Sequence, residues 1–108
     1  MDAAPNLDLT FQALTNPTRR AVVERLGHGP ATVTELATPF AMALPSFLDH
    51  LKILEKSGLV ESQKRGRVRT VRLRPERLRS ATDWLATQRD LWERRLNQLD
   101  DYLESMED

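Results

Sequence analysis

Residues 32–58 read TVTELATPFAMALPSFLDHLKILEKSG and contain two predicted helices joined by a short connection. The first begins at Thr32, because Thr32 and Glu35 form a T-x-x-E capping box in which each side chain can bond the other residue's backbone N–H. The second is expected from Leu44-Pro45 to Lys56, with Gly58 closing it. Its apolar stripe consists of Leu44, Phe47, Leu48, Leu51 and Leu54. Two helices this close together predict a helix-turn-helix.

Two more helices are expected before this stretch. Leu7, Phe11 and Leu14 recur at helical spacing and predict the first helix, from Leu7 to Leu14. Asn16-Pro17 then opens the second helix, since asparagine is a good N-cap and proline fits the first helical position. This second helix is expected to stop at Gly27.

A β-hairpin is expected after Gly58, where the spacing of apolar residues changes from about 3.6 to about 2. Residues 59–64 and 67–74 are predicted to be its strands, joined by a turn at Arg65-Gly66. Glycine can adopt the positive φ that a tight hairpin turn requires. The second strand carries arginines near its start and apolar residues near its end on one face. We therefore expect a hairpin with a buried base and a tip that projects from the body.

Pro75 ends the hairpin and can open the last helix, which is expected to continue to about Met106. Its apolar residues follow a spacing close to a heptad seam, and they are Leu85, Trp92, Leu96, Leu99, Leu103 and Met106. A helix of this length would extend beyond a compact body, so the seam would face water. We therefore expect a homodimer with the seam at its interface, and the alternative is that the seam packs against its own chain. The expected interface residues are Leu7, Phe11, Leu85, Trp92, Leu96, Leu99 and Leu103.

The 108 residues correspond to a single domain, 1–108, with a body over 7–74 and a dimerisation helix over 75–106. Apolar residues make up 40% of the chain, and the formal net charge is zero. The zero net charge is the sum of a basic region and an acidic region. Eight basic residues and one acid lie between Lys64 and Arg79, whereas eight acids and three bases lie between Ser80 and Asp108. A basic hairpin favours binding to nucleic acid, although charge runs also occur on solvated surfaces.

The composition excludes several classes of protein. The chain has no cysteine, and so no disulfide, thiolate metal site or cysteine nucleophile. No apolar run approaches the ~20 residues that span a bilayer, and the N-terminus lacks the features of a signal peptide. A cytoplasmic protein with no membrane partner is expected. With two histidines and neither a Gly-rich phosphate loop nor a Ser-His-Asp arrangement, we expect no enzymatic activity and no cofactor.

The order of the predicted helices and strands, and the spacing of several short segments within them, resemble the ArsR/SmtB family of winged helix-turn-helix repressors. The segments that carry the resemblance are 13–20 (ALTNPTRR), 35–37 (ELA), 44–55 (LPSFLDHLKILE), 58–60 (GLV) and 66–69 (GRVR) with Leu73. The resemblance implies a mostly α fold with a small β-hairpin wing, in the order α-α-α-α-β-β-α. It also implies a symmetric homodimer built on the first and last helices, with the fourth helix in the major groove of operator DNA. Members of this family often repress their own operons.

The N-terminal residues of the second helix of a helix-turn-helix contact base edges. On the polar side of that helix the candidates are Pro45, Ser46, Asp49, His50 and Lys52. Asp49 can accept a hydrogen bond from cytosine N4, whereas the family commonly has a neutral polar or basic residue there. Ala43 likewise replaces the family's usual serine N-cap. Phosphates would be neutralised by the wing residues Lys64, Arg65, Arg67 and Arg69.

One histidine, two arginines and two tryptophans have two interpretations each. By resemblance, His50 contacts the DNA backbone or braces the recognition helix. Arg19 or Arg20 is either a further DNA contact or a surface charge. Trp84 and Trp92 lie on nearly the same side of the last helix, where they either line a small-molecule pocket or pack in the core and seam.

The sequence does not identify a signal that the protein would sense. Where many relatives carry paired cysteines this chain has Thr32 and Thr34, and the last helix has no histidine, so no metal site is expected. A small-molecule effector is allowed but unidentified. The alternative function is a winged-helix protein-interaction module that uses the acidic last helix as its binding surface.

Overall fold

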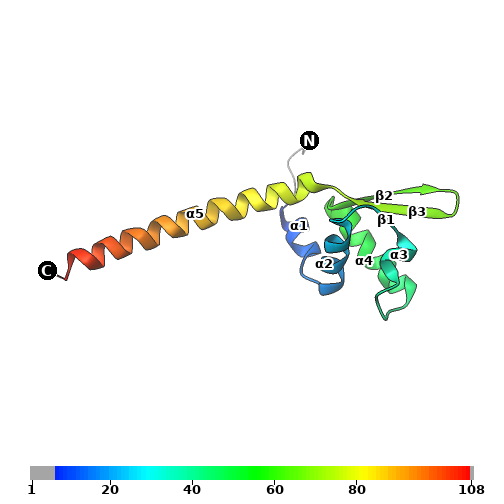
Figure 1. Ribbon diagram of the computed structural model, residues 1–108, viewed down its shortest axis with the longest axis horizontal. Helices are drawn as coiled ribbons and strands as arrows, with labels where there is room; N and C mark the ends of the chain where they lie inside the picture. The colour runs from blue at the N-terminus through cyan, green and yellow to red at the C-terminus, as the bar shows by residue number, and fades with distance from the viewer. Residues whose placement is uncertain (1–6, 108) are drawn as a thin grey trace.

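The protein is described by a computed structural model that covers residues 7–107. It measures 74 × 37 × 22 Å, because a small body carries one long projecting helix (Figure 1). The elements are α1 (Leu7–Ala13), α2 (Pro17–Leu26), β1 (Ala31–Thr32), α3 (Val33–Ala37), α4 (Leu44–Ser57), β2 (Val60–Arg65), β3 (Val68–Leu73) and α5 (Pro75–Ser105). This arrangement confirms the predicted winged helix-turn-helix.

The predicted capping residues set the helix ends. The Asn16 side chain accepts a hydrogen bond from the Arg19 backbone N–H at 3.1 Å, at the start of α2. At the start of α3, Thr32 and Glu35 form both bonds of the capping box, at 3.1 and 2.8 Å. The bond from the Thr32 backbone N–H is the main reason that the pKa of the Glu35 carboxyl lies below its ordinary value. α4 ends at Gly58, whose φ of 84° lies in the left-handed region that glycine tolerates.

The wing belongs to a three-stranded antiparallel sheet in the order β1-β3-β2. This corrects the predicted order of elements, which lacked β1. Two residues are too few to show an alternating pattern, so only the pairing of Ala31 with Val71 of β3 defines this strand. β2 and β3 pair over their whole length, and Gly66, with a φ of 61°, forms the turn between them. β1 therefore widens the base of the wing and leaves its tip as a two-stranded hairpin.

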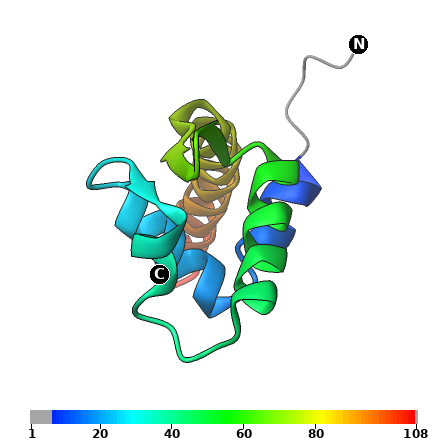
Figure 2. The same ribbon diagram turned by 90° about the vertical axis from the view of Figure 1, so that its right-hand side faces the viewer.

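The core lies between the helices and the base of the sheet, and it consists of Ala13, Val22, Leu26, Ala31, Leu36, Phe47, Leu51, Leu54, Leu59, Val60 and Val71. α4 packs against α1 and α2 (Figure 2). Phe40, in the connection between α3 and α4, stacks on Phe47 with ring centroids 5.7 Å apart. Val60 and Val71 are buried, whereas residues 63–70 of the hairpin are exposed. The base of the wing is therefore buried and its tip projects, as predicted.

α5 runs for 31 residues, and only its first turns pack on the body. There, Ala81 is buried, and Trp84 meets Phe11 edge-on with ring centroids 5.9 Å apart. Beyond these turns the helix leaves the body (Figure 1), and its large apolar side chains are 46% to 65% exposed. These are Leu85, Leu91, Trp92, Leu96, Leu99, Tyr102, Leu103 and Met106. The seam thus does not pack back on its own chain.

Over residues 7–107, no helix combines the length and the apolar composition needed to cross a membrane.

Candidate nucleic-acid interface

α4 buries one side in the core and presents the other to solvent. Phe47, Leu51 and Leu54 are buried. The predicted base-contacting residues on the opposite side, Pro45, Ser46, Asp49 and Lys52, are exposed. Ala43 at the N-cap makes no side-chain hydrogen bond to the first turn, because the alanine methyl group cannot accept one. The polar face of α4 is therefore open to a partner from its first turn onward.

The wing places its cations beyond the body. The exposed cations at its tip are Lys64, Arg65 and Arg67. Arg69 is tied back toward the body, because its Nη1 donates a hydrogen bond to the Ser62 hydroxyl oxygen at 2.9 Å. The Ser62 hydroxyl in turn donates to the carboxylate of Glu55 on α4. These polar contacts connect the wing to the recognition helix.

An open groove of about 360 Å³ lies between α3, α4 and the wing. Its lining residues are Thr32, Val33, Thr34, Leu44, Leu48, Lys64, Arg67, Val68 and Arg69. Three of the four predicted wing cations thus border the same groove as the first turns of α4. Arg65, the fourth, is not among the residues that line it. Leu44 was expected in the buried stripe of α4 but is 54% exposed at this groove, so the buried stripe starts at Phe47.

His50, half-buried on α4, contacts Arg19 of α2. The Arg19 Nη1 lies 3.0 Å from the His50 Nδ1. A guanidinium can only donate, so Nδ1 must be the acceptor and the neutral imidazole carries its hydrogen on Nε2. The contact supports the bracing role expected for His50, and it leaves an Nε2–H donor for a second partner.

Arg19 and Arg20 both bind carbonyl groups of their own chain, but only Arg19 is buried, so neither expected interpretation holds for Arg19, whereas Arg20 remains an exposed surface charge. Arg19 is 8% exposed, and its guanidinium donates to the backbone oxygens of Ala13 at 2.7 Å and Gln12 at 3.2 Å. Arg20 donates to the Leu14 oxygen at 2.7 Å. These carbonyls belong to the end of α1, where the backbone oxygens run out of helical donors, and the Gln12 oxygen also accepts from the Thr15 backbone N–H at 3.2 Å.

Sequence reasoning missed the structural role of Arg19, although a signal was present. Arg19 precedes the buried residues Val22 and Leu26 by three and seven positions, so it lies on the buried stripe of α2. An arginine on that stripe needs acceptors nearby, and the end of α1 supplies them.

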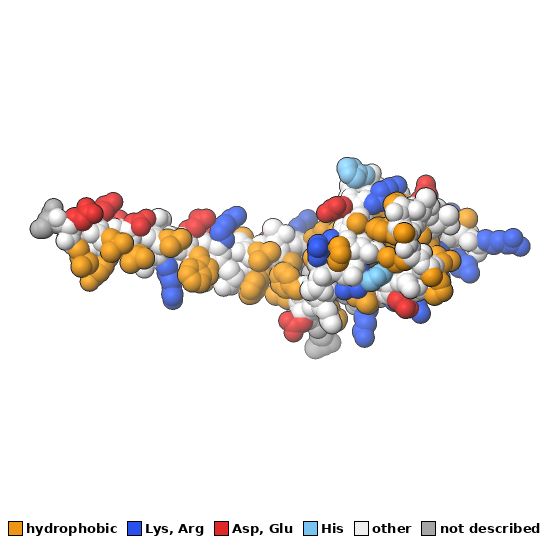
Figure 3. All heavy atoms as spheres, turned by 90° about the horizontal axis from the view of Figure 1, so that it is seen from below, with side chains coloured by type: hydrophobic (Ala, Val, Ile, Leu, Met, Phe, Trp, Pro, Cys, Tyr) orange, Lys and Arg blue, Asp and Glu red, His pale blue; other side chains and the backbone are white. Residues whose placement is uncertain are grey.

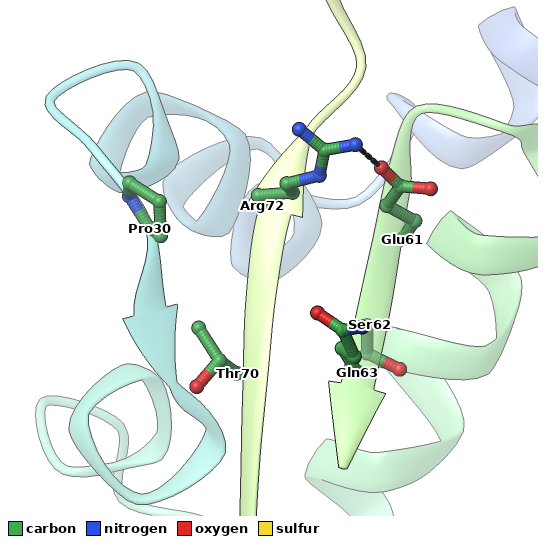
Figure 4. A pocket seen from close by; sticks show the side chains of 6 residues that line it. All are labelled: Pro30, Glu61, Ser62, Gln63, Thr70 and Arg72. Carbon is green, nitrogen blue, oxygen red and sulfur yellow. Dashed lines mark ion pairs between the residues drawn. The ribbon is translucent and has the colours of Figure 1, made fainter. Parts of the chain in front are cut away.

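A second hollow, of about 300 Å³, lies on the outer face of the sheet (Figure 4). It is lined by Pro30, Glu61, Ser62, Gln63, Thr70 and Arg72. Arg72 and Glu61 pair across β3 and β2, so the charges in this hollow compensate each other. Among the described residues there is no group of three or more His, Asp or Glu side chains that could hold a metal ion.

Residues 14–63 match the helix-turn-helix domain family, a range that runs from the end of α1 into β2. The crystal structure of the ArsR family transcriptional regulator RHA00566 superposes with a TM-score of 0.78 at 55% sequence identity, covering 81% of this chain and 96% of that one. The chain belongs to the ArsR family of transcriptional regulators.

Two curated relatives agree with this assignment to the ArsR family. The HTH-type transcriptional regulator Rv2034 of Mycobacterium tuberculosis is 44% identical over 68 residues, which are 63% of this chain and 64% of Rv2034. The chain thus spans slightly less than two thirds of that relative. The transcriptional repressor SdpR of Bacillus subtilis is 28% identical over 75 residues, which are 69% of this chain and 83% of SdpR.

Proposed function

We propose that this ArsR-family chain is a sequence-specific regulator that binds double-stranded DNA, with α4 in the major groove and the wing on flanking phosphates. The groove shared by the first turns of α4 and the wing cations carries the proposal. Ser46 and Asp49 contact base edges from the exposed face of α4. The Nε2–H of His50 and the Lys52 ammonium bind phosphate oxygens.

The functional unit in this proposal is a homodimer. The exposed apolar face of α5 is too long to remain in water without a partner, and the half-buried Leu7 and Phe11 of α1 lie where that face begins. Two copies joined in this way present two recognition helices to one duplex, as symmetric operators require.

We propose repression as the direction of control, in keeping with the name of the related repressor SdpR. A dimer on an operator would exclude other proteins from the same DNA, in the cytoplasm where that DNA lies. The DNA upstream of the protein's own gene is the first operator to test, since relatives often control their own operons.

The salt dependence of binding tests the role of the wing. Two wings supply six groove-lining cations, namely Lys64, Arg67 and Arg69 of each copy. Log K measured by fluorescence anisotropy should therefore fall with log salt at a slope of about −5. The double variant Arg67→Ala, Arg69→Ala removes four of these six cations, and its slope should be about −2. Arg94→Ala, an exposed arginine on α5, is the matched control and should leave the slope unchanged. An unaltered slope in the double variant would contradict the proposed interface.

Light scattering tests the dimer separately. Leu96→Asp places a charge on the exposed seam and should give a monomer that binds DNA weakly. An unchanged mass would reject the seam as the interface. A dimer that binds no duplex even in dilute buffer would instead favour a protein-interaction module built on the acidic face of α5.

A further inference from the structure

The groove between α3, α4 and the wing is lined by apolar side chains as well as by cations. Leu44 and Val68 line it and are 54% and 52% exposed. The half-buried Val33 and Leu48 complete this apolar part, and the charged part consists of three cations with no acid among the lining residues. Figure 3 shows lysine and arginine side chains projecting at the wing end of the molecule and apolar side chains exposed on the adjoining part of the body. Phosphate binding accounts for the cations but not for the exposed apolar side chains.

Leu44 and Leu48 lie side by side on α4, since residues four positions apart share one side of a helix. This side faces the wing, because both residues border the groove together with Val68 of β3. Pro45 and Asp49, each one position further along, form the neighbouring row on the exposed face proposed to contact base edges. The apolar pair therefore lies between the base-contacting face of α4 and the wing cations.

A double helix offers one apolar group to a side chain in this position. In the major groove the base edges present hydrogen-bond donors and acceptors, and thymine alone adds a C5-methyl group. This methyl group lies on the side of the base that is nearest its own sugar-phosphate backbone. With α4 in the major groove and the wing on the flanking phosphates, that backbone would run between them, and the methyl group would face the side of α4 that carries Leu44. An aliphatic side chain against guanine or cytosine would instead leave polar groups without partners.

We propose that Leu44, supported by Leu48, recognises the C5-methyl group of thymine at a fixed position in each half-site of the operator. The proposal rests on the DNA binding of the proposed function and adds an apolar base contact to it. Leu48 packs against the core, so it holds its side of the contact in place, whereas the exposed Leu44 side chain is open to the base. Because the methyl group belongs to one base of the pair, this contact also distinguishes T·A from A·T.

Replacing thymine by uracil tests the contact on the unmodified protein, because dU lacks only the C5-methyl group and keeps every hydrogen-bonding group of dT. The probe is a duplex that the protein selects from a random-sequence pool, synthesised once with dT and once with dU throughout. Losing one buried methyl group should weaken binding about fourfold, so the loss over two half-sites should be about tenfold or more in fluorescence anisotropy. Both duplexes carry the same phosphates, so the slope of log K against log salt should be the same for the two. Equal affinities for the two duplexes would overturn the proposal.

Leu44→Ala tests which side chain reads the methyl group. In this variant the loss between the dT and dU duplexes should shrink to about threefold or less, because little apolar surface remains for the methyl group to contact. Ile53→Ala is the matched control, since Ile53 is another exposed aliphatic residue of α4 but does not line the groove. It should keep the full loss of about tenfold. An equally large loss in Leu44→Ala would overturn the role of Leu44, provided that circular dichroism shows the same thermal unfolding for both variants.

Single replacements of dT by dU, one thymine at a time, locate the contact. A loss of about fourfold should appear at symmetric positions, one in each half-site, and not at the other thymines. The outcomes also separate this proposal from the proposed function. A protein that selects no duplex would reject both. A protein that binds its selected duplex with the expected salt slope, but binds dT and dU duplexes equally, would retain the proposed function and reject the methyl contact.

Discussion

Replacing Arg19 with alanine should destabilise the protein by about 3–4 kcal/mol. The side chain is 8% exposed and makes three contacts, to Ala13 oxygen at 2.7 Å, Gln12 oxygen at 3.2 Å and His50 Nδ1 at 3.0 Å. Hydrogen bonds from a charged donor typically contribute about 1.5–3 kcal/mol, and the truncation removes this donor from all three acceptors, of which the Gln12 oxygen keeps the bonds from Thr15. Because water can reach the partly exposed acceptors, the expected loss is below the sum of three such bonds.

Arg20 provides a matched control one residue away. It is exposed and makes one hydrogen bond, to Leu14 oxygen at 2.7 Å, so Arg20→Ala should cost about 0.5–1 kcal/mol. Urea unfolding followed by circular dichroism measures both variants, at one protein concentration because association adds to stability. With an m-value of about 1.5 kcal/mol/M, Arg19→Ala should lower the midpoint by roughly 2 M. A loss within about 1 kcal/mol of the Arg20→Ala loss would refute the assigned role of Arg19.

Three further outcomes are expected. The pKa of Glu35 lies below its ordinary value because the Thr32 backbone N–H donates to the carboxylate, so this contribution to stability is present above the unfolded-state pKa. It is lost as the pH falls through the lower folded-state pKa, and Glu35→Gln should therefore show a smaller drop in Tm between about pH 5 and pH 3 than the unmodified protein. Gly58→Ala should lower stability by about 1–3 kcal/mol in thermal unfolding, because φ is 84° and the added Cβ would lie 2.7 Å from the Arg77 Nε. Asp49→Ala should change base preference across single-base operator variants more than overall affinity, and a uniform loss would contradict a base contact.

The parts of the fold that depend on local chemistry could be predicted from the sequence. Asn16 and Thr32 start their helices through bonds to backbone groups only three residues away. Gly58 ends α4 because the left-handed backbone conformation that closes a helix is one that glycine adopts readily. The buried base and projecting tip of the wing also follow from the sequence, since the apolar and basic positions of β3 are separated along one strand.

The parts that depend on distant partners could not be predicted in this way. β1 is a strand only because Ala31 pairs with Val71 of β3, forty residues away in the sequence. Two residues are too few to show the alternation of apolar and polar side chains that predicts a strand. Arg19 looked like a surface cation until the end of α1 and His50 were placed around it. Leu44 fits the apolar period of α4, but the groove beside the wing leaves it half exposed. The candidate DNA residues of α4 and the wing lie on exposed surfaces except for His50, which is half-buried, and the position of Arg65 away from the groove was not evident from the sequence.

Because α5 is long and its apolar face is exposed, the fraction of the protein that is dimeric should depend on protein concentration. An isolated helical segment with an exposed apolar face is only marginally stable in water, so in the proposed homodimer the outer half of α5 would gain most of its stability from the second copy. Ordering of that segment and association are then one coupled equilibrium, and the amount of DNA-competent protein rises with the square of the monomer concentration when dimers are scarce. The number of copies in the cell would thus itself set operator occupancy, and a gene controlled by its own product would settle at a level determined by the stability of this helix pair.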